Sequence, residues 1–106
     1  LLQLVAETIR RGIRATDVVG RIGGDEFVVL LPETESEAAE VVIRKMMEEL
    51  PSVTQGSPWP VTFSVGVLTV ETSSISVDEM IRMADELMYS AKKKGKNMLH
   101  QRTIRG

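Results

Sequence analysis

The 106-residue chain has no cysteine, no large excess of charge of either sign and no long apolar run, and each of these absences excludes a class of function. Without cysteine there is no disulfide, thiolate metal cluster or cysteine nucleophile. Thirteen Lys and Arg against fifteen Asp and Glu give a net charge of −2, which argues against a general nucleic-acid binder. The longest apolar stretch, residues 27–31, is far shorter than the roughly 20 residues of a membrane-spanning helix. We therefore expect no nucleic acid as partner and no membrane contact from this segment.

The chain begins at Leu1 rather than Met, and residues 1–5 have the pattern of the middle of an amphipathic helix. No capping residue, signal-peptide charge or cleavage site precedes them. We expect a piece of a longer protein whose front is missing. The remaining composition, 42% hydrophobic and 26% charged residues, is that of one globular domain.

Hydrophobic spacing predicts the element order α-β-β-α-β-α-β in one compact unit. The strands are expected at residues 18–22, 27–31, 61–70 and 97–101. The first two form a hairpin, because a glycine-rich turn separates them. A hairpin combined with helical crossovers implies an α+β fold with a mixed, largely antiparallel sheet flanked by helices. One further strand and helix at the missing front would complete a ferredoxin-like βαββαβ core.

Capping residues and helix breakers set the expected ends of the three helices. The first should end before Asp17. The other two should each begin at a capping box, Thr34-Glu35-Ser36-Glu37 and Ser76-Val77-Asp78-Glu79. Pro51 is expected to stop the second helix, and Gly95 to stop the third.

The stretch Gly23-Gly24-Asp25-Glu26-Phe27 most strongly suggests chemistry. Glycines admit positive φ and let a ligand approach the backbone without a Cβ in the way. Two adjacent carboxylates offer oxygen ligands suited to Mg²⁺. In a strand they would point to opposite faces, so only one would line a site unless the turn twists them together. The residues alone favour the plainer alternative, a hairpin turn with solvated acids.

Two charged clusters have both a structural and a functional interpretation. Lys92-Lys93-Lys94-Gly95-Lys96 is either a solvated helix end that complements the helix dipole or a clamp for the terminal phosphates of a nucleotide. Arg14 and Asp17, three residues apart, form either an exposed ion pair worth ~0–1 kcal/mol or a site for a guanine edge and a phosphate. His100 is the only histidine, and without a nucleophile at motif spacing we expect it to be structural.

Three stretches in fixed order resemble one family. They are Arg21-Ile22-Gly23-Gly24-Asp25-Glu26-Phe27, then residues 63–67 (Phe-Ser-Val-Gly-Val), then residues 84–97 with the lysine cluster. The first resembles the signature of the diguanylate cyclases, the GGDEF domains, and the others resemble that family's later strand and last helix. By this resemblance, residues 1–106 are identified as a partial GGDEF domain with a nucleotidyl-cyclase-like fold.

The resemblance implies a bacterial signalling enzyme, a nucleotidyltransferase that condenses two GTP into the second messenger cyclic di-GMP and releases pyrophosphate. Mg²⁺ or Mn²⁺ would assist. Two domains would face each other as a homodimer, so that the 3′-hydroxyl of each GTP attacks the α-phosphorus of the other. Such chemistry is mainly positioning and charge neutralisation, so carboxylates and lysines suffice without a covalent nucleophile. The expected location is the cytoplasm, including the cytoplasmic part of a membrane-anchored sensor.

The same resemblance assigns roles to individual residues. Gly23 and Gly24 would accommodate the nucleotide, Asp25 would hold metal and help deprotonate the hydroxyl, and Glu26 would support the catalytic and metal site. The terminal phosphates would be bound by two lysines, Lys92 and Lys96.

A second set of residues matches the family's product-inhibition site. Arg14 and Asp17 match the family's Arg-x-x-Asp, which is separated by five residues from the first glycine of the signature, Gly23, and they would bind cyclic di-GMP as a feedback inhibitor. Lys45 or Arg44 would be a further contact for the same product.

The chain departs from the family at its front, where a first strand and the helices after it would supply another metal-binding Asp and guanine-reading Asn and Asp groups. We therefore expect these 106 residues alone to be inactive. Two other interpretations compete: a non-catalytic module that binds GTP or cyclic di-GMP and signals to a partner, and a purely structural α+β domain. The unaltered signature argues against the first, and the coincidence of three motifs argues against the second.

Overall fold

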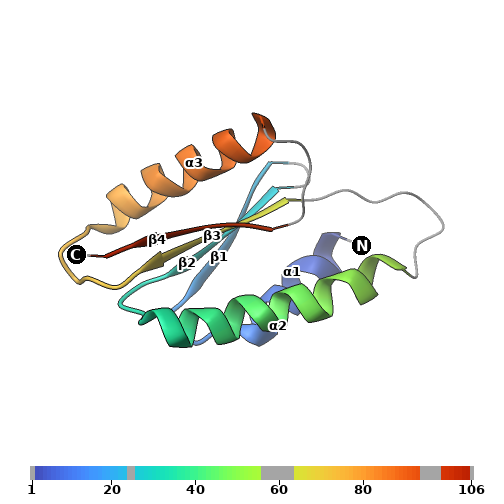
Figure 1. The fold of residues 1–106 in the computed structure, drawn as a ribbon. Helices are drawn as coiled ribbons and strands as arrows, with labels where there is room; N and C mark the ends of the chain where they lie inside the picture. The colour runs from blue at the N-terminus through green and yellow to red at the C-terminus, as the bar shows by residue number, and fades with distance from the viewer. Residues whose placement is uncertain (1, 24–25, 56–63, 94–98, 106) are drawn as a thin grey trace.

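The computed structural model describes residues 2–23, 26–55, 64–93 and 99–105, and the elements follow the predicted order. Figure 1 shows an α+β fold in which helices flank a central sheet. The helices are α1 (Leu2–Gly12), α2 (Ser36–Gln55) and α3 (Val77–Lys93). The strands are β1 (Val18–Gly23), β2 (Glu26–Leu31), β3 (Ser64–Val70) and β4 (Leu99–Ile104). The predicted fold class is confirmed.

The sheet has the spatial order β1-β2-β3-β4. The predicted hairpin is present, since β1 and β2 pair antiparallel. By contrast, β2 pairs with β3, and β3 with β4, in parallel. The sheet is therefore mixed, as predicted, but the expectation that it is largely antiparallel is wrong for the described strands. The reason is that α2 and α3 carry the chain back along the sheet, so each following strand starts from the same end.

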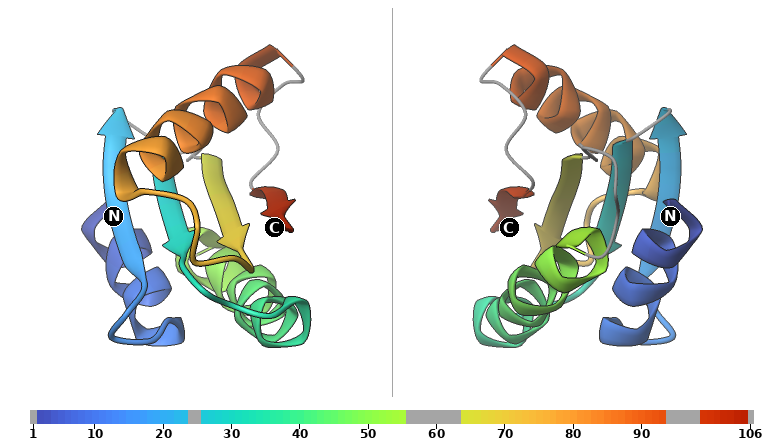
Figure 2. Two further views of the ribbon diagram at one scale, coloured as in Figure 1. Left: turned by 90° about the vertical axis from the view of Figure 1, so that its left-hand side faces the viewer. Right: turned by 90° about the vertical axis from the view of Figure 1, so that its right-hand side faces the viewer.

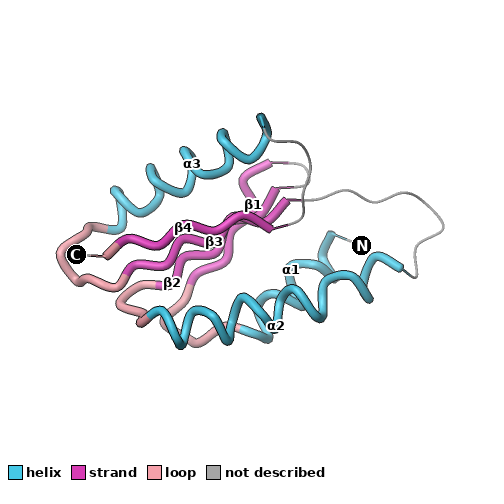
Figure 3. The backbone as a smooth tube through the Cα atoms, in the orientation of Figure 1, coloured by secondary structure: helices cyan, strands magenta, loops and turns pink. Residues whose placement is uncertain are grey.

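The sheet is covered on both faces. In the tube view of Figure 3 and the side views of Figure 2, α1 and α2 lie on one face and α3 lies on the other. Alternation along β2 divides its side chains between two cores, because successive residues of a strand point to opposite faces. Phe27 and Val29 pack with residues of α1 and α2, and Leu30 packs with Met80 and Ala84 of α3.

The start of α2 differs from the prediction. Thr34 does not cap the helix, because its hydroxyl contacts Arg14 and Pro32 instead. The backbone N–H of Ser36 donates to Glu71 Oε1 at 3.0 Å, and the Ser36 hydroxyl contacts the same oxygen. A carboxylate from beyond the end of β3 thus does the work expected of a local cap, and it suits the positive end of the helix dipole.

The capping prediction at α3 is confirmed, since the Glu79 N–H donates to Ser76 Oγ at 3.2 Å. The prediction that Pro51 ends α2 is wrong, because the helix continues through Pro51 to Gln55. Proline removes one backbone donor, and the apolar face continues beyond it with Val53 packed on the core. The predicted positions of Gly95, and of residues 61–63 and 97–98, lie outside the described residues.

No helix in the part of the chain that the structure describes has the length and hydropathy to span a membrane.

Candidate functional site

The two candidate sites lie at opposite ends of β1. Asp17 directly precedes this strand, and Gly23 is its last residue. Six residues at about 3.3 Å each separate them by roughly 20 Å. The hairpin that carries the signature and the Arg14–Asp17 pair are thus two distinct sites.

At the hairpin end, Gly23 and Glu26 form the last pair of the antiparallel ladder. A Cβ built on Gly23 would lie 2.6 Å from Oε1 of Glu26, which is closer than real Cβ atoms approach. The missing side chain of Gly23 therefore makes room for the Glu26 carboxylate. The ladder register shifts between Arg21 and Gly23, and Arg21 Nε donates to the Gly23 carbonyl at 3.2 Å. Such an irregularity re-aims side chains at the end of a strand.

The backbone of Lys92, one of the two predicted phosphate lysines, lies at the same end of the sheet. Figure 1 shows the C-terminal end of α3, which contains the backbone of Lys92, at the end where β1 and β2 meet. The Lys92 side chain lies outside what the structure describes, as do the predicted site residues Gly24, Asp25 and Lys96. The topology thus brings Glu26 and the backbone of Lys92 to one end of the sheet, and the site that they would share stays a prediction.

The donor chemistry at the hairpin fits the expected metal. Glu26 supplies carboxylate oxygens, and Asp25 precedes it in the sequence. Such hard ligands suit Mg²⁺, which is usually held by one or two carboxylates together with substrate phosphates. Among the described residues, no group of three or more His, Asp or Glu side chains is arranged to hold a metal.

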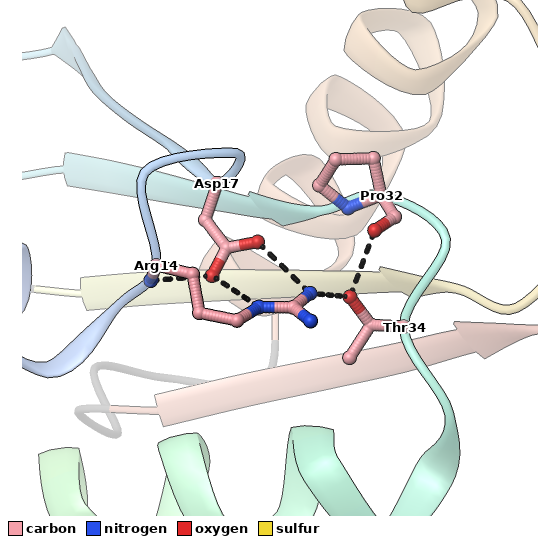
Figure 4. Close-up of polar contacts among 4 residues, drawn as sticks. All are labelled: Arg14, Asp17, Pro32 and Thr34. Carbon is pink, nitrogen blue, oxygen red and sulfur yellow. Dashed lines mark hydrogen bonds and ion pairs between the residues drawn. The ribbon is translucent and has the colours of Figure 1, made fainter.

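At the other end of β1, Arg14 and Asp17 close the turn that follows α1 (Figure 4). The Arg14 backbone N–H donates to Asp17 Oδ2 at 2.8 Å, and the Asp17 N–H donates to the Arg14 carbonyl at 3.0 Å. The guanidinium reaches both carboxylate oxygens, with Nε 3.4 Å from Oδ2 and Nη2 3.3 Å from Oδ1. The Asp17 side chain is completely buried, whereas that of Arg14 is 48% exposed. The pair is therefore not the exposed ion pair that the sequence left open as one of two alternatives.

Thr34 completes this cluster, although the sequence pattern pointed to a helix cap. Arg14 Nη2 donates to Thr34 Oγ1, and the Thr34 hydroxyl donates to the Pro32 carbonyl at 2.8 Å (Figure 4). Thr34 is 1% exposed. The partners are 20 residues apart in sequence, so no local signal could have identified the contact.

A pocket of about 380 Å³ opens beside the cluster. It is lined by Arg10, Ile13, Arg14, Ala15, Asp17, Val18 and Val19. Neither of the further product-site candidates on α2 lines it. Lys45 lines another pocket with Arg11, and its Cδ is 3.8 Å from the position of a Cβ on Gly12. Arg44 is paired with Glu40 at 2.7 Å.

Comparison with known proteins identifies related domains. The family model of the diguanylate cyclase GGDEF domain matches residues 1–98. The chain is 29% identical over 98% of its length to the probable diguanylate cyclase DgcT of Escherichia coli, and 35% identical over 92% to diguanylate cyclase A of Treponema denticola. These matches cover 24% and 27% of the two relatives, so the chain spans about a quarter of their length. No solved structure gives a significant match.

Proposed function

The chain belongs to the diguanylate cyclase GGDEF-domain family, and from that premise we propose that the intact protein condenses two GTP into cyclic di-GMP with release of pyrophosphate. The observation that carries the proposal is the signature hairpin, in which Gly23 leaves room for the carboxylate of Glu26 at the end of the β1–β2 ladder. The proposal includes GTP as substrate, a second domain of the same kind as partner, and the cytoplasm as the location of the reaction.

The proposed mechanism relies on positioning and charge. Asp25 and Glu26 would hold Mg²⁺ or Mn²⁺, which when bound neutralises negative charge on the triphosphate. Asp25 also takes up the proton of the attacking 3′-hydroxyl. Gly23 and Gly24 let the nucleotide approach the backbone. The terminal phosphates are bound by two lysines from α3 and the segment after it, Lys92 and Lys96.

The proposal includes product feedback at Arg14. Arginine pairs with the acceptor atoms of guanine and with phosphate, and the half-exposed Arg14 lines a pocket. Asp17 is buried, and both of its carboxylate oxygens accept hydrogen bonds from the Arg14 guanidinium. We therefore propose that Asp17 orients the guanidinium and does not itself contact the ligand. Because the hairpin lies roughly 20 Å away along β1, bound product acts on the reaction indirectly.

The test of the cyclase proposal uses the intact protein with GTP and Mg²⁺, and cyclic di-GMP is measured by chromatography. Asp25→Ala should lower product formation at least about 100-fold, since it removes a metal ligand and a base. Asp78→Ala, which removes an exposed carboxylate from α3, is the matched control and should retain activity. Binding of GTP or cyclic di-GMP without any turnover would favour the non-catalytic module. The 106-residue chain alone is the third sample, in which we expect no product.

A further inference from the structure

Thr34 contacts Arg14 through a hydroxyl whose hydrogen-bonding roles are fixed by its partners. The guanidinium can only donate, and the Pro32 carbonyl can only accept. The Thr34 hydroxyl must therefore accept from Arg14 Nη2 and donate to Pro32, from which its oxygen is 2.8 Å away. Its proton is directed to the carbonyl, so its lone pairs are available to the guanidinium. A valine, which has the shape of threonine without the hydroxyl, could make neither bond.

The backbone of Thr34 is also held, and by a different part of the molecule. Its N–H donates to the carbonyl of Val70, the last residue of β3, at 2.8 Å. The preceding residue, Glu33, has a φ of 47°, a conformation that non-glycine residues rarely adopt and that turns the chain sharply between β2 and α2. The position of the Thr34 hydroxyl is thus set by the ends of two central strands.

Asp17 and Thr34 contribute to the orientation of Arg14 in different ways. Asp17 belongs to the same turn as Arg14, so it moves with Arg14 if that turn moves. Thr34 is anchored to β2 and β3, so it fixes the guanidinium relative to the sheet. In Figure 4 the guanidinium lies between these two partners. The Arg14 side chain is nevertheless 48% exposed, which leaves part of its surface available to a ligand.

We propose that Thr34 is a positioning residue of the product site, which holds the Arg14 guanidinium in the orientation that binds cyclic di-GMP. The inference rests on the proposed function of Arg14. A free arginine side chain loses conformational freedom when a ligand immobilises it. Holding the side chain beforehand removes this cost, which for one long side chain corresponds to roughly a 3- to 10-fold gain in affinity.

The experiment measures the dissociation constant of cyclic di-GMP for the intact protein by calorimetry. Thr34→Val keeps the shape but removes the hydroxyl, and it should weaken binding about 3- to 10-fold. Thr34→Ser keeps the hydroxyl and should bind within about 2-fold of the wild type. In an Arg14→Ala background, Thr34→Val should cause no further loss, because its effect acts through Arg14. A purely structural role would not give this dependence on Arg14.

The outcomes separate the two proposals. Wild-type affinity in Thr34→Val, together with weakened binding in Arg14→Ala, would overturn the positioning role and leave the product site intact. Wild-type affinity in Arg14→Ala would instead overturn the product site itself. If Thr34→Val does not fold, Thr34→Cys replaces it, because a thiol is only a weak acceptor and should give the same loss. Wild-type affinity in the folded Thr34→Cys variant would equally overturn the positioning role.

Discussion

The two ends of β1 carry sites that are built in different ways. At the hairpin end, Gly23 and Glu26 are the last pair of the β1–β2 ladder, and they are only three residues apart in sequence. At the other end, Arg14 donates a hydrogen bond to the Thr34 hydroxyl, and the Thr34 backbone N–H donates to the carbonyl of the last residue of β3. The proposed catalytic site is thus encoded in one short motif, whereas the orientation of the proposed binding side chain is supplied by distant parts of the fold.

The largest expected effect tests the local site. Gly23→Ala would place a Cβ 2.6 Å from Glu26 Oε1, so the carboxylate must move. The carboxylate is the end of a flexible side chain and can swing aside, but it then leaves the position that we propose for metal binding, and we expect kcat/KM for GTP to fall about 10- to 100-fold. Gly20→Ala on the same strand is the matched control, because its Cβ would meet Val28 at an ordinary 3.8 Å. Equal activity in both variants would refute the steric argument.

The second prediction concerns the distant site. Arg14→Ala removes the guanidinium that we assign to the product, so the concentration of cyclic di-GMP needed for half-inhibition should rise at least about 10-fold. Initial rates at increasing product concentration provide the measurement. Arg82→Ala is the control, because Arg82 does not line the Arg14 pocket and forms an exposed pair with Glu86 within α3. Inhibition that persists unchanged in Arg14→Ala would exclude this product site.

The third prediction compares a buried and an exposed acid. Asp17→Ala leaves the Arg14 backbone N–H without its acceptor and the guanidinium with only Thr34, which should lower the free energy of unfolding by about 1–3 kcal/mol. Glu40→Ala breaks the exposed pair with Arg44 and should cost no more than about 0.5 kcal/mol. Denaturant unfolding monitored by circular dichroism checks both values. If the two variants lose similar free energies of unfolding, the burial of Asp17 contributes little to stability.

The smallest expected effect concerns the carboxylate at the start of α2. The hydrogen bond from the Ser36 side chain, followed by that from its backbone, lowers the pKa of Glu71 below its ordinary value of 4.5, and Arg105 adds to the effect although partial burial opposes it. Because the pKa of Glu71 is lower in the folded than in the unfolded state, the ionised carboxylate stabilises the fold. This stabilisation is complete at pH values above the ordinary pKa, and it is lost as the pH falls through the lower pKa of the folded state.

Glu71→Gln should therefore make the melting temperature fall less than in the wild type between about pH 5 and about pH 3. Glu48→Gln, which changes an exposed acid in the middle of α2, is the control and should follow the wild-type curve. Parallel melting curves for wild type and Glu71→Gln would show that the Ser36–Glu71 contact does not anchor the helix.

Much of the fold could be predicted because it depends on local patterns. The element order, the hairpin and the start of α3 at Ser76 follow from hydrophobic spacing, turn residues and capping chemistry. The Arg14–Asp17 pair could also be identified, because its two residues lie within one turn. The roles of Asp25, Lys92 and Lys96 stay predictions, since their side chains lie outside the described residues.

The sequence by itself determined the family, the signature at the hairpin turn and the pairing of Arg14 with Asp17. Tertiary structure alone decided that Thr34 serves Arg14 rather than α2, and that Glu71 caps α2 from 35 residues away. It also decided that two of the three strand pairings are parallel. The physical reason is that a polar side chain bonds to whichever partner packing brings within reach, and strand direction depends on how a crossover helix packs on the sheet.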